Sequence, residues 1–144
     1  MNALRGLIAV VGGLAITRLI VQPLEITLVN ALAPQPPQSA ADVAAVLNAP
    51  LMMAARVVYT GVGAILGGYL TARIAGHDPM RYTMVASLFL ALILTVGFAS
   101  GYEPATPIWI RVALVVVSSG GLLAGGAVRS AVAALPQVPR TEEN

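Results

Sequence analysis

The chain has no cysteine and few charged side chains, and each shortage narrows its class. The absence of cysteine excludes disulfides, thiolate metal sites and cysteine catalysis. Charged residues make up 10% of the 144 residues, too few to cover the surface of a soluble domain of this length. All eight basic residues are arginine, and they form no cluster with aromatic residues of the kind that binds nucleic acid. We therefore expect a membrane protein that does not bind nucleic acid.

Hydrophobic residues are abundant instead, at 58% of the chain, and they fall into four long runs. A membrane-spanning helix needs about 20 apolar residues, so four spans and their connectors use the whole length. The sequence predicts an all-α fold, a single membrane domain over residues 1–144 built as a four-helix bundle. The expected helices are 3–32, 50–76, 79–99 and 107–134, with a connector at 33–49 and a polar tail at 135–144.

Short polar residues mark two of the expected helix starts. In the connector, Ser39 is placed to cap a short helix, and Asp42, three residues later, favours the same helix start. Asp78 and Pro79 supply a cap and a first-turn residue for the third span. We expect side-chain caps at both places.

The first apolar run has an alternative interpretation as a cleaved signal peptide, because Ala31-Leu32-Ala33 has the small-x-small form of a cleavage site. Three features oppose it. The run is about twice the normal hydrophobic length, Arg18 and Glu25 interrupt it, and Pro34 would follow the cut directly. We expect an uncleaved anchor helix.

The second span carries its small residues on one side. At 100° per residue they fall on one broad arc that includes Gly63 and Gly67, while the large apolar residues fall on the other. Gly121 and Gly125 repeat this pattern in the fourth span. In lipid, small faces let helix backbones approach closely, so we expect these glycines to pack helices around the second span. Two such faces also favour a homo- or hetero-oligomer.

Four large polar side chains lie well inside the first two apolar runs. Arg18, Gln22 and Glu25 follow the i, i+4, i+7 spacing of one helix face. In an antiparallel pair of helices, Glu25 and Arg56 reach nearly the same depth, and Arg56 lies on the small arc of the second span. An unpaired charge at that depth would cost several kcal/mol. We therefore expect a Glu25–Arg56 ion pair.

Two functions fit these charges. A buried ion pair that fixes helix register indicates a structural or accessory subunit, whereas a channel or transporter would use Arg18, Glu25 and Arg56 to pass an ion or small solute. We favour the first, because no other group completes a transport mechanism. We expect no enzyme, metal or other cofactor, since the single histidine, His77, lies in a turn and no base faces Ser118 or Ser119.

The arginines also predict an orientation. Basic residues favour the cytoplasmic side, and in a four-span arrangement five of the eight arginines share the side of both termini: Arg5, Arg73, Arg81, Arg129 and Arg140. Both termini are therefore expected in the cytoplasm. The exclusive use of arginine, with abundant Ala, Gly and Val, is typical of a GC-rich bacterial genome. We expect a bacterial inner-membrane protein with the lipid bilayer as its partner.

The segment GGYLTARIAGHDPM, residues 67–80, resembles a run in small four-helix bacterial inner-membrane proteins of undetermined function. Such proteins have a helix rich in small residues that ends in Ala-Arg, then a turn with proline, then a plain apolar helix. The run covers 14 of the 144 residues. The resemblance implies a membrane bundle and no particular activity.

Overall fold

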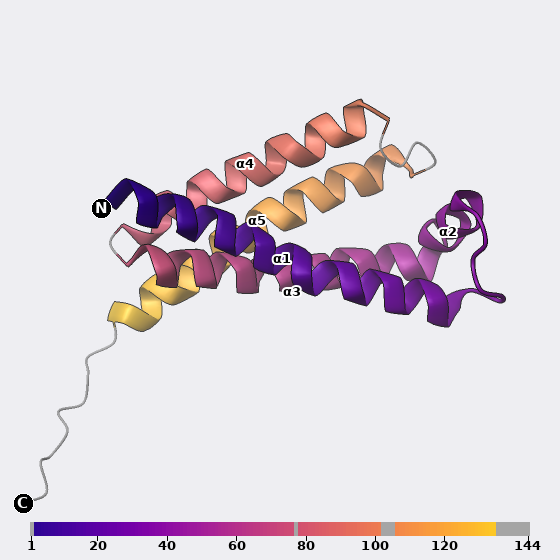
Figure 1. Cartoon of the computed structure of the whole chain (residues 1–144), viewed down its shortest axis with the longest axis horizontal. Coiled ribbons are helices and arrows are strands. Elements are labelled where there is room, and N and C mark those ends of the chain that lie inside the picture. Colours follow the sequence, from indigo (N-terminus) through magenta and orange to yellow (C-terminus); the bar gives the residue numbers. More distant parts are fainter. Residues whose placement is uncertain (1, 77, 102–105, 135–144) are drawn as a thin grey trace, which may run out of the picture.

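The computed structural model describes residues 2–76, 78–101 and 106–134, and every regular element within them is an α-helix (Figure 1). Four of the helices are long and apolar enough to cross a membrane, which confirms the all-α, four-span prediction. The predictions for His77 and for the tail at 135–144 lie outside these residues. The helices are α1 (Asn2–Leu32), α2 (Ala40–Leu47), α3 (Pro50–Ala75), α4 (Pro79–Ala99) and α5 (Ile108–Ala134).

The ends of the spans lie within one residue of their predicted positions. Gly76 ends α3 with a φ of 78°, a backbone conformation that side chains other than glycine rarely adopt. The predicted side-chain cap at Asp78 is wrong. Asp78 does precede α4, but its backbone is left-handed (φ 49°, ψ 50°) and its side chain makes no capping hydrogen bond. The tight turn from α3 therefore overrides the usual extended conformation of a capping residue.

The short helix α2 begins with the predicted cap. The Asp42 amide donates to Ser39 Oγ at 3.2 Å, and the Ser39 amide donates back to Asp42 Oδ2 at 3.0 Å. This reciprocal pair satisfies two amides that the helix leaves without partners. Leu47, at the end of α2, packs in a buried cluster with Val29 of α1 and Met52 of α3. The connector is thus held across the end of the α1–α3 pair (Figure 1).

The capping pair predicts a change in the pKa of Asp42 on mutation. Hydrogen bonds from the Ser39 side chain, and then from the Gln38 amide, hold the pKa of Asp42 below its ordinary value of 3.8. Because the folded pKa is depressed, the stabilisation is present above about pH 3.8 and is lost as pH falls through the lower folded value. Ser39→Ala should raise the pKa of Asp42 toward 3.8, measured by carbon NMR titration of the carboxyl group. Ser130→Ala, a matched change in α5, should leave it unchanged; an unchanged pKa in Ser39→Ala would contradict the cap.

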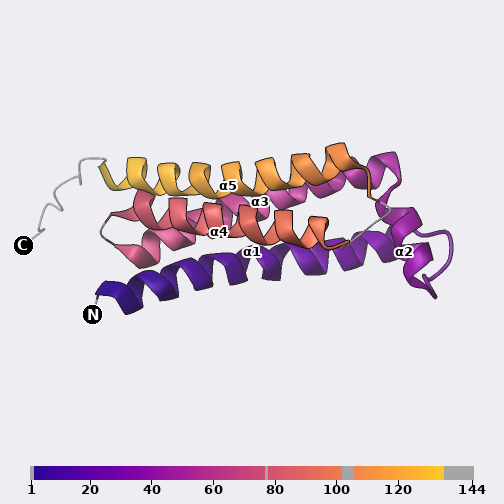
Figure 2. The same cartoon turned by 90° about the horizontal axis from the view of Figure 1, so that it is seen from above.

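The helix α3 is the centre of the bundle. It packs against α1 on one side and α5 on the other, and in the described part of the chain the backbones of α1 and α5 do not come close to each other. Figure 2 shows these two helices at opposite edges with α3 and α4 between them. The fourth span, α5, also supports α4, which lies close to α1 at the N-terminal end and moves away from it toward the α2 end (Figure 1).

Glycines allow α1 to approach α3 closely. A Cβ atom added at Gly63 would lie 2.9 Å from the Val21 side chain, and one added at Gly67 would lie 2.7 Å from the Gly13 carbonyl oxygen and against Thr17. Both predicted glycines are buried. The sequence analysis did not single out their partners on α1, although Gly13 and Thr17 follow the same small-xxx-small spacing.

The contact between α3 and α5 is made backbone to backbone. A Cβ atom at Gly121 would lie 2.7 Å from Ala64 Cβ, and one at Gly125 would lie against the Ile65 carbonyl oxygen and 2.6 Å from the Tyr69 amide nitrogen. Gly68 of α3 likewise faces the Leu122 backbone. The small arc of α3 is therefore shared between two neighbours, one on each side.

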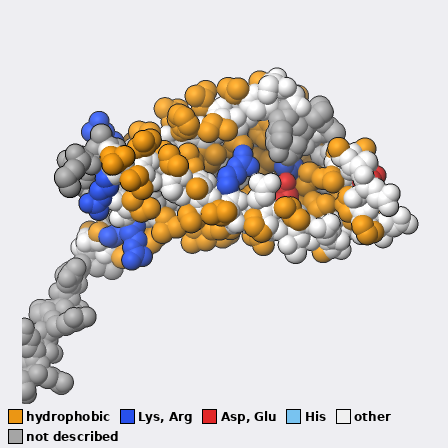
Figure 3. Space-filling model, viewed as in Figure 1, with side chains coloured by type: hydrophobic (Ala, Val, Ile, Leu, Met, Phe, Trp, Pro, Cys, Tyr) orange, Lys and Arg blue, Asp and Glu red, His pale blue; other side chains and the backbone are white. Residues whose placement is uncertain are grey.

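The outside of the bundle is apolar. Large hydrophobic side chains such as Leu88 (73% exposed) and Ile108 (77% exposed) point away from the other helices. Figure 3 shows that hydrophobic side chains cover most of the face seen there, while basic side chains gather at the N-terminal end. Exposed leucine and isoleucine at this density fit a surface that faces lipid rather than water. The architecture is that of a multi-pass membrane protein.

Candidate functional site

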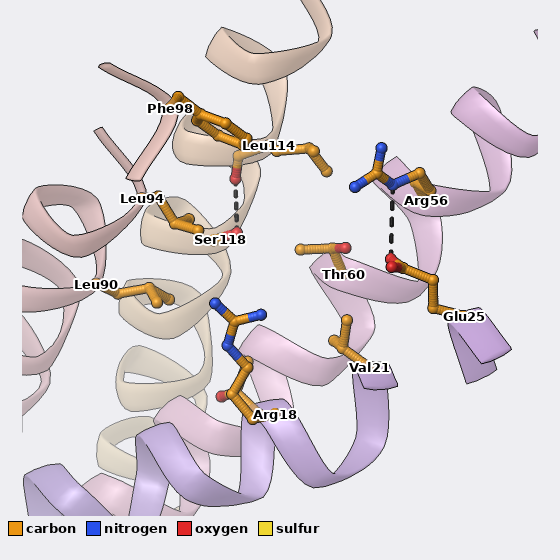
Figure 4. A pocket seen from close by; sticks show the side chains of 11 residues that line it. Arg18, Val21, Glu25, Arg56, Thr60, Leu90, Leu94, Phe98, Leu114 and Ser118 are labelled. Atoms are coloured by element: carbon orange, nitrogen blue, oxygen red, sulfur yellow. Dashed lines mark hydrogen bonds and ion pairs between the residues drawn. The ribbon is translucent and has the colours of Figure 1, made fainter. Parts of the chain in front are cut away.

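A cavity of about 70 Å³, lined by both apolar and polar side chains, lies between the helices. Helices α1, α3, α4 and α5 all contribute to its wall (Figure 4). Leucine and phenylalanine side chains of α4, with Val21 of α1 and Leu114 of α5, form the apolar part. The polar part consists of Thr17, Arg18, Glu25, Arg56, Thr60 and Ser118. Three of the four polar residues selected from the sequence therefore line one cavity.

Glu25 and Arg56 lie side by side, with Arg56 Nε 3.6 Å from Glu25 Oε2. The Arg56 side chain is 5% exposed and that of Glu25 is 29% exposed, so the pair sits at the rim of the buried interior. The Tyr59 hydroxyl donates to the same carboxylate oxygen at 2.8 Å. The carboxylate of Glu25 thus joins α1 to two successive turns of α3.

The sequence analysis missed Tyr59, although a signal was present. Tyr59 lies three residues after Arg56, and residues at this spacing project from the same side of a helix. A tyrosine there places a hydroxyl donor within reach of any carboxylate that pairs with the arginine. The aromatic body of Tyr59 is 7% exposed and belongs to the buried cluster near α2.

Arg18 projects into the same cavity from α1. Figure 4 shows its guanidinium group directed toward the α5 wall that holds Ser118, with Leu90 of α4 and Thr60 of α3 on either side. Among the described residues, Arg18 makes no hydrogen bond or ion pair, in contrast to Arg56. It is the 17th of the 31 residues of α1, so its charge lies at mid-length of the span.

The structure does not bring Gln22 to this site. Gln22 is exposed and lies beside Pro23 on the outer surface of α1. Helical geometry explains the difference. Glu25 lies about 20° from Arg18 around the helix axis, whereas Gln22 lies about 40° from it in the opposite sense. That rotation is enough to turn Gln22 out of the cavity.

The hydroxyl groups in the wall are largely committed to the backbone. Ser118 Oγ donates to the Leu114 carbonyl oxygen at 2.6 Å, and Thr17 Oγ1 donates to the Gly13 carbonyl oxygen at 2.9 Å. Both bonds run back four residues within one helix, a common arrangement for such residues in spans. Ser118 has its proton engaged, and among the described residues that line the cavity no histidine or lysine is present to activate it.

The cavity carries a net positive charge. Arg18 and Arg56 contribute two guanidinium groups and Glu25 one carboxylate, which leaves one positive charge when all three are ionised. No three His, Cys, Asp or Glu side chains lie together anywhere in the part of the chain that the structure describes. The arrangement therefore favours water or an anion over a metal ion.

Apolar packing closes the cavity on its N-terminal side. Ala64, Ala86, Leu90 and Leu122, one or two from each of α3, α4 and α5, form a buried cluster there, and Val10 and Leu14 of α1 pack against it. Beyond this cluster lies the arginine-rich end, where Arg5 Nε donates to the Ile74 carbonyl oxygen at 2.8 Å. The charged groups of the cavity are thus separated from that end by a layer of aliphatic side chains.

Comparison of the chain with family models, with curated proteins and with solved structures gave no match.

Proposed function

We propose that this protein is a structural or accessory membrane subunit, in which the Glu25–Arg56 pair fixes the register of α1 against α3. The observation that carries the proposal is that the polar wall of the cavity does not continue along the bundle. Its polar wall ends at the aliphatic cluster around Leu90 and Leu122, so the residues that the structure describes form no continuous polar path along the bundle. A channel needs such a path, whereas a register-fixing pair does not.

The arginine distribution supports an orientation with both termini in the cytoplasm. Arg5, Arg73, Arg81 and Arg129 belong to the same end of the bundle, and the capped α2 lies at the other. We propose a bacterial inner membrane as the location, with α2 on the outer side. The resemblance of residues 67–80 to small inner-membrane proteins agrees with this location and adds no activity.

Purification from the native membrane in a mild detergent tests this proposal. An accessory subunit should bring down a second protein in a fixed ratio, and it should give no solute flux after reconstitution into vesicles on its own. A homodimer without any partner, together with solute flux that Arg18→Gln removes, would contradict the proposal. Arg129→Gln, a change of the same charge at the far end of α5, is the matched control for the flux measurement.

One observation favours a small channel or transporter as the second candidate. The guanidinium group of Arg18 points into the cavity and has no partner within the described chain. A charge kept inside a span without a partner usually serves an ion or solute pathway. In that case the aliphatic cluster would have to open during transport, and the flux measurement above separates the two candidates.

A further inference from the structure

We propose that the cavity is a binding site for one oxyanion, a phosphate or carboxylate group, with Arg18 as the principal ligand. The site goes beyond the accessory role proposed above and does not depend on it. A subunit of a larger assembly and a transporter could both hold such an anion. Four observations carry the proposal: the state of Arg18, the charge of the wall, the size of the cavity and the side from which it opens.

The first observation is the state of Arg18. Its guanidinium group faces the cavity near the middle of a 31-residue helix, while the residue remains exposed on one side of α1, and it makes no hydrogen bond or ion pair within the described chain. A charge at that depth is unfavourable unless something neutralises it. The planar guanidinium fork matches carboxylate and phosphate oxygens in a two-point contact. An oxyanion would therefore supply the partner that the chain does not.

The second observation is the charge of the wall around Arg18. The Thr60 hydroxyl lies between the guanidinium groups of Arg18 and Arg56, and it can donate a further hydrogen bond to an anion (Figure 4). Glu25 is held on the far side by Arg56 and Tyr59, away from Arg18. The net charge of the wall is one positive unit, so a single negative group would make the site neutral.

The third observation is size. A cavity of about 70 Å³ has room for roughly five water molecules or one small anionic group. Pockets for drug-sized ligands are several times larger, roughly 300 to 1,000 Å³. The space beside Arg18 therefore fits a headgroup or a free inorganic anion and is too small for a bulky organic solute.

The fourth observation is access. The aliphatic cluster borders the cavity toward the N-terminal end, while Arg18, which lines the cavity, is exposed on the surface of α1. Figure 3 shows basic and acidic side chains at the middle of an otherwise apolar face, so charged groups reach the surface there. An anion can thus reach Arg18 from this exposed face of the bundle. A lipid phosphate and a free oxyanion share the chemistry that Arg18 recognises.

Two binding measurements on the full-length protein in detergent distinguish these sources. The first titrates inorganic phosphate and follows bound ligand by calorimetry, with chloride kept constant. The second adds phosphatidylglycerol and counts retained lipids by native mass spectrometry. We expect one saturable site per chain for one of the two probes. A lipid that binds where phosphate does not identifies a headgroup site, and phosphate that binds by itself identifies a free-anion site.

Variants at Arg18 decide whether the site is the one proposed. Arg18→Gln should weaken binding of the retained probe by about tenfold or more, because a hydrogen-bonded charge is lost. Arg18→Lys should fall in between, since it keeps the charge and loses the fork. Arg129→Gln should bind like the parent protein. Arg18 is exposed on α1, so Arg18→Gln should still fold, as checked by its melting temperature. Unchanged binding in Arg18→Gln, or no binding of either probe by the parent protein, would overturn the proposal.

Discussion

Glu25→Gln is expected to destabilise the protein by about 3 to 5 kcal/mol, because it leaves a buried guanidinium group without its carboxylate. Arg56 is 5% exposed at the side chain and cannot reach water by a simple rotation. Arginine also does not neutralise itself by losing a proton. The measurement is the free energy of unfolding in mixed detergent micelles, with denaturing detergent as the variable.

Arg56→Gln should cost less than Glu25→Gln, because the two partners differ in surroundings. Glu25 is 29% exposed and keeps the hydrogen bond from the Tyr59 hydroxyl when Arg56 is lost. The double variant, with neutral glutamine at both positions, should lose less stability than the sum of the single variants. Tyr59→Phe removes one hydrogen bond and keeps the aromatic packing. Its loss of stability shows how much an uncharged change costs at the same site.

Additive losses in this cycle would show that the two charges do not interact, and the structural role of the pair would then fail. A second result would support the pathway function and leave the description of the fold unchanged. If all three variants unfold like the parent protein while solute flux disappears, the charges serve a pathway and not the register of α1 against α3. The stability cycle and the flux measurement together therefore separate the two proposed functions.

The spans could be predicted from the sequence because their signals are local. Apolar runs of the required length are bounded by Pro50, Gly76 and Pro79, and each of these residues lies at or next to a helix end in the structure. The depth of Glu25 and Arg56 also follows from counting residues along antiparallel helices. Such inferences need only the helical rise and the order of the elements.

The cavity could not be predicted in the same way, because it depends on how the helices cross. The separation of α4 from α1 leaves space beside Arg18, and no residue spacing encodes that angle; it is set by which ridges and grooves fit together. The position of Gln22 shows the same limit at smaller scale. Residues at positions i, i+4 and i+7 cover a wide face of a helix. Which of them is buried depends on the helices that pack against that face.

The division of the small arc of α3 was also beyond sequence reasoning. Gly63 and Gly67 serve α1, while Gly68 serves α5, although Gly67 and Gly68 are adjacent in the chain. Adjacent residues point about 100° apart around a helix, so one glycine pair reaches two neighbours. The sequence predicts a single face of small residues on α3. In the structure one edge of this face packs against α1 and the other against α5.

Gly125→Ala is expected to destabilise the bundle by about 3 kcal/mol, at the upper end of the usual cost of overpacking. The added methyl group would meet the Ile65 carbonyl oxygen and the Tyr69 amide nitrogen, which belong to the α3 backbone. A flexible side chain can rotate away from a clash, but a helix backbone can only move as a whole. The α3–α5 contact would have to separate along its length, and close backbone approach is what stabilises helix pairs in lipid.

Gly120→Ala provides the matched control on the same helix. A Cβ atom at Gly120 would have no atom of another helix within 4 Å, since that side of α5 is exposed. The change should leave stability equal to or slightly above that of the parent, because alanine favours helix over glycine. Melting temperatures in one detergent give the comparison directly. If Gly125→Ala has the same melting temperature as Gly120→Ala, then α3 and α5 are not in backbone contact. The central position of α3 in the bundle would then have to be reassigned.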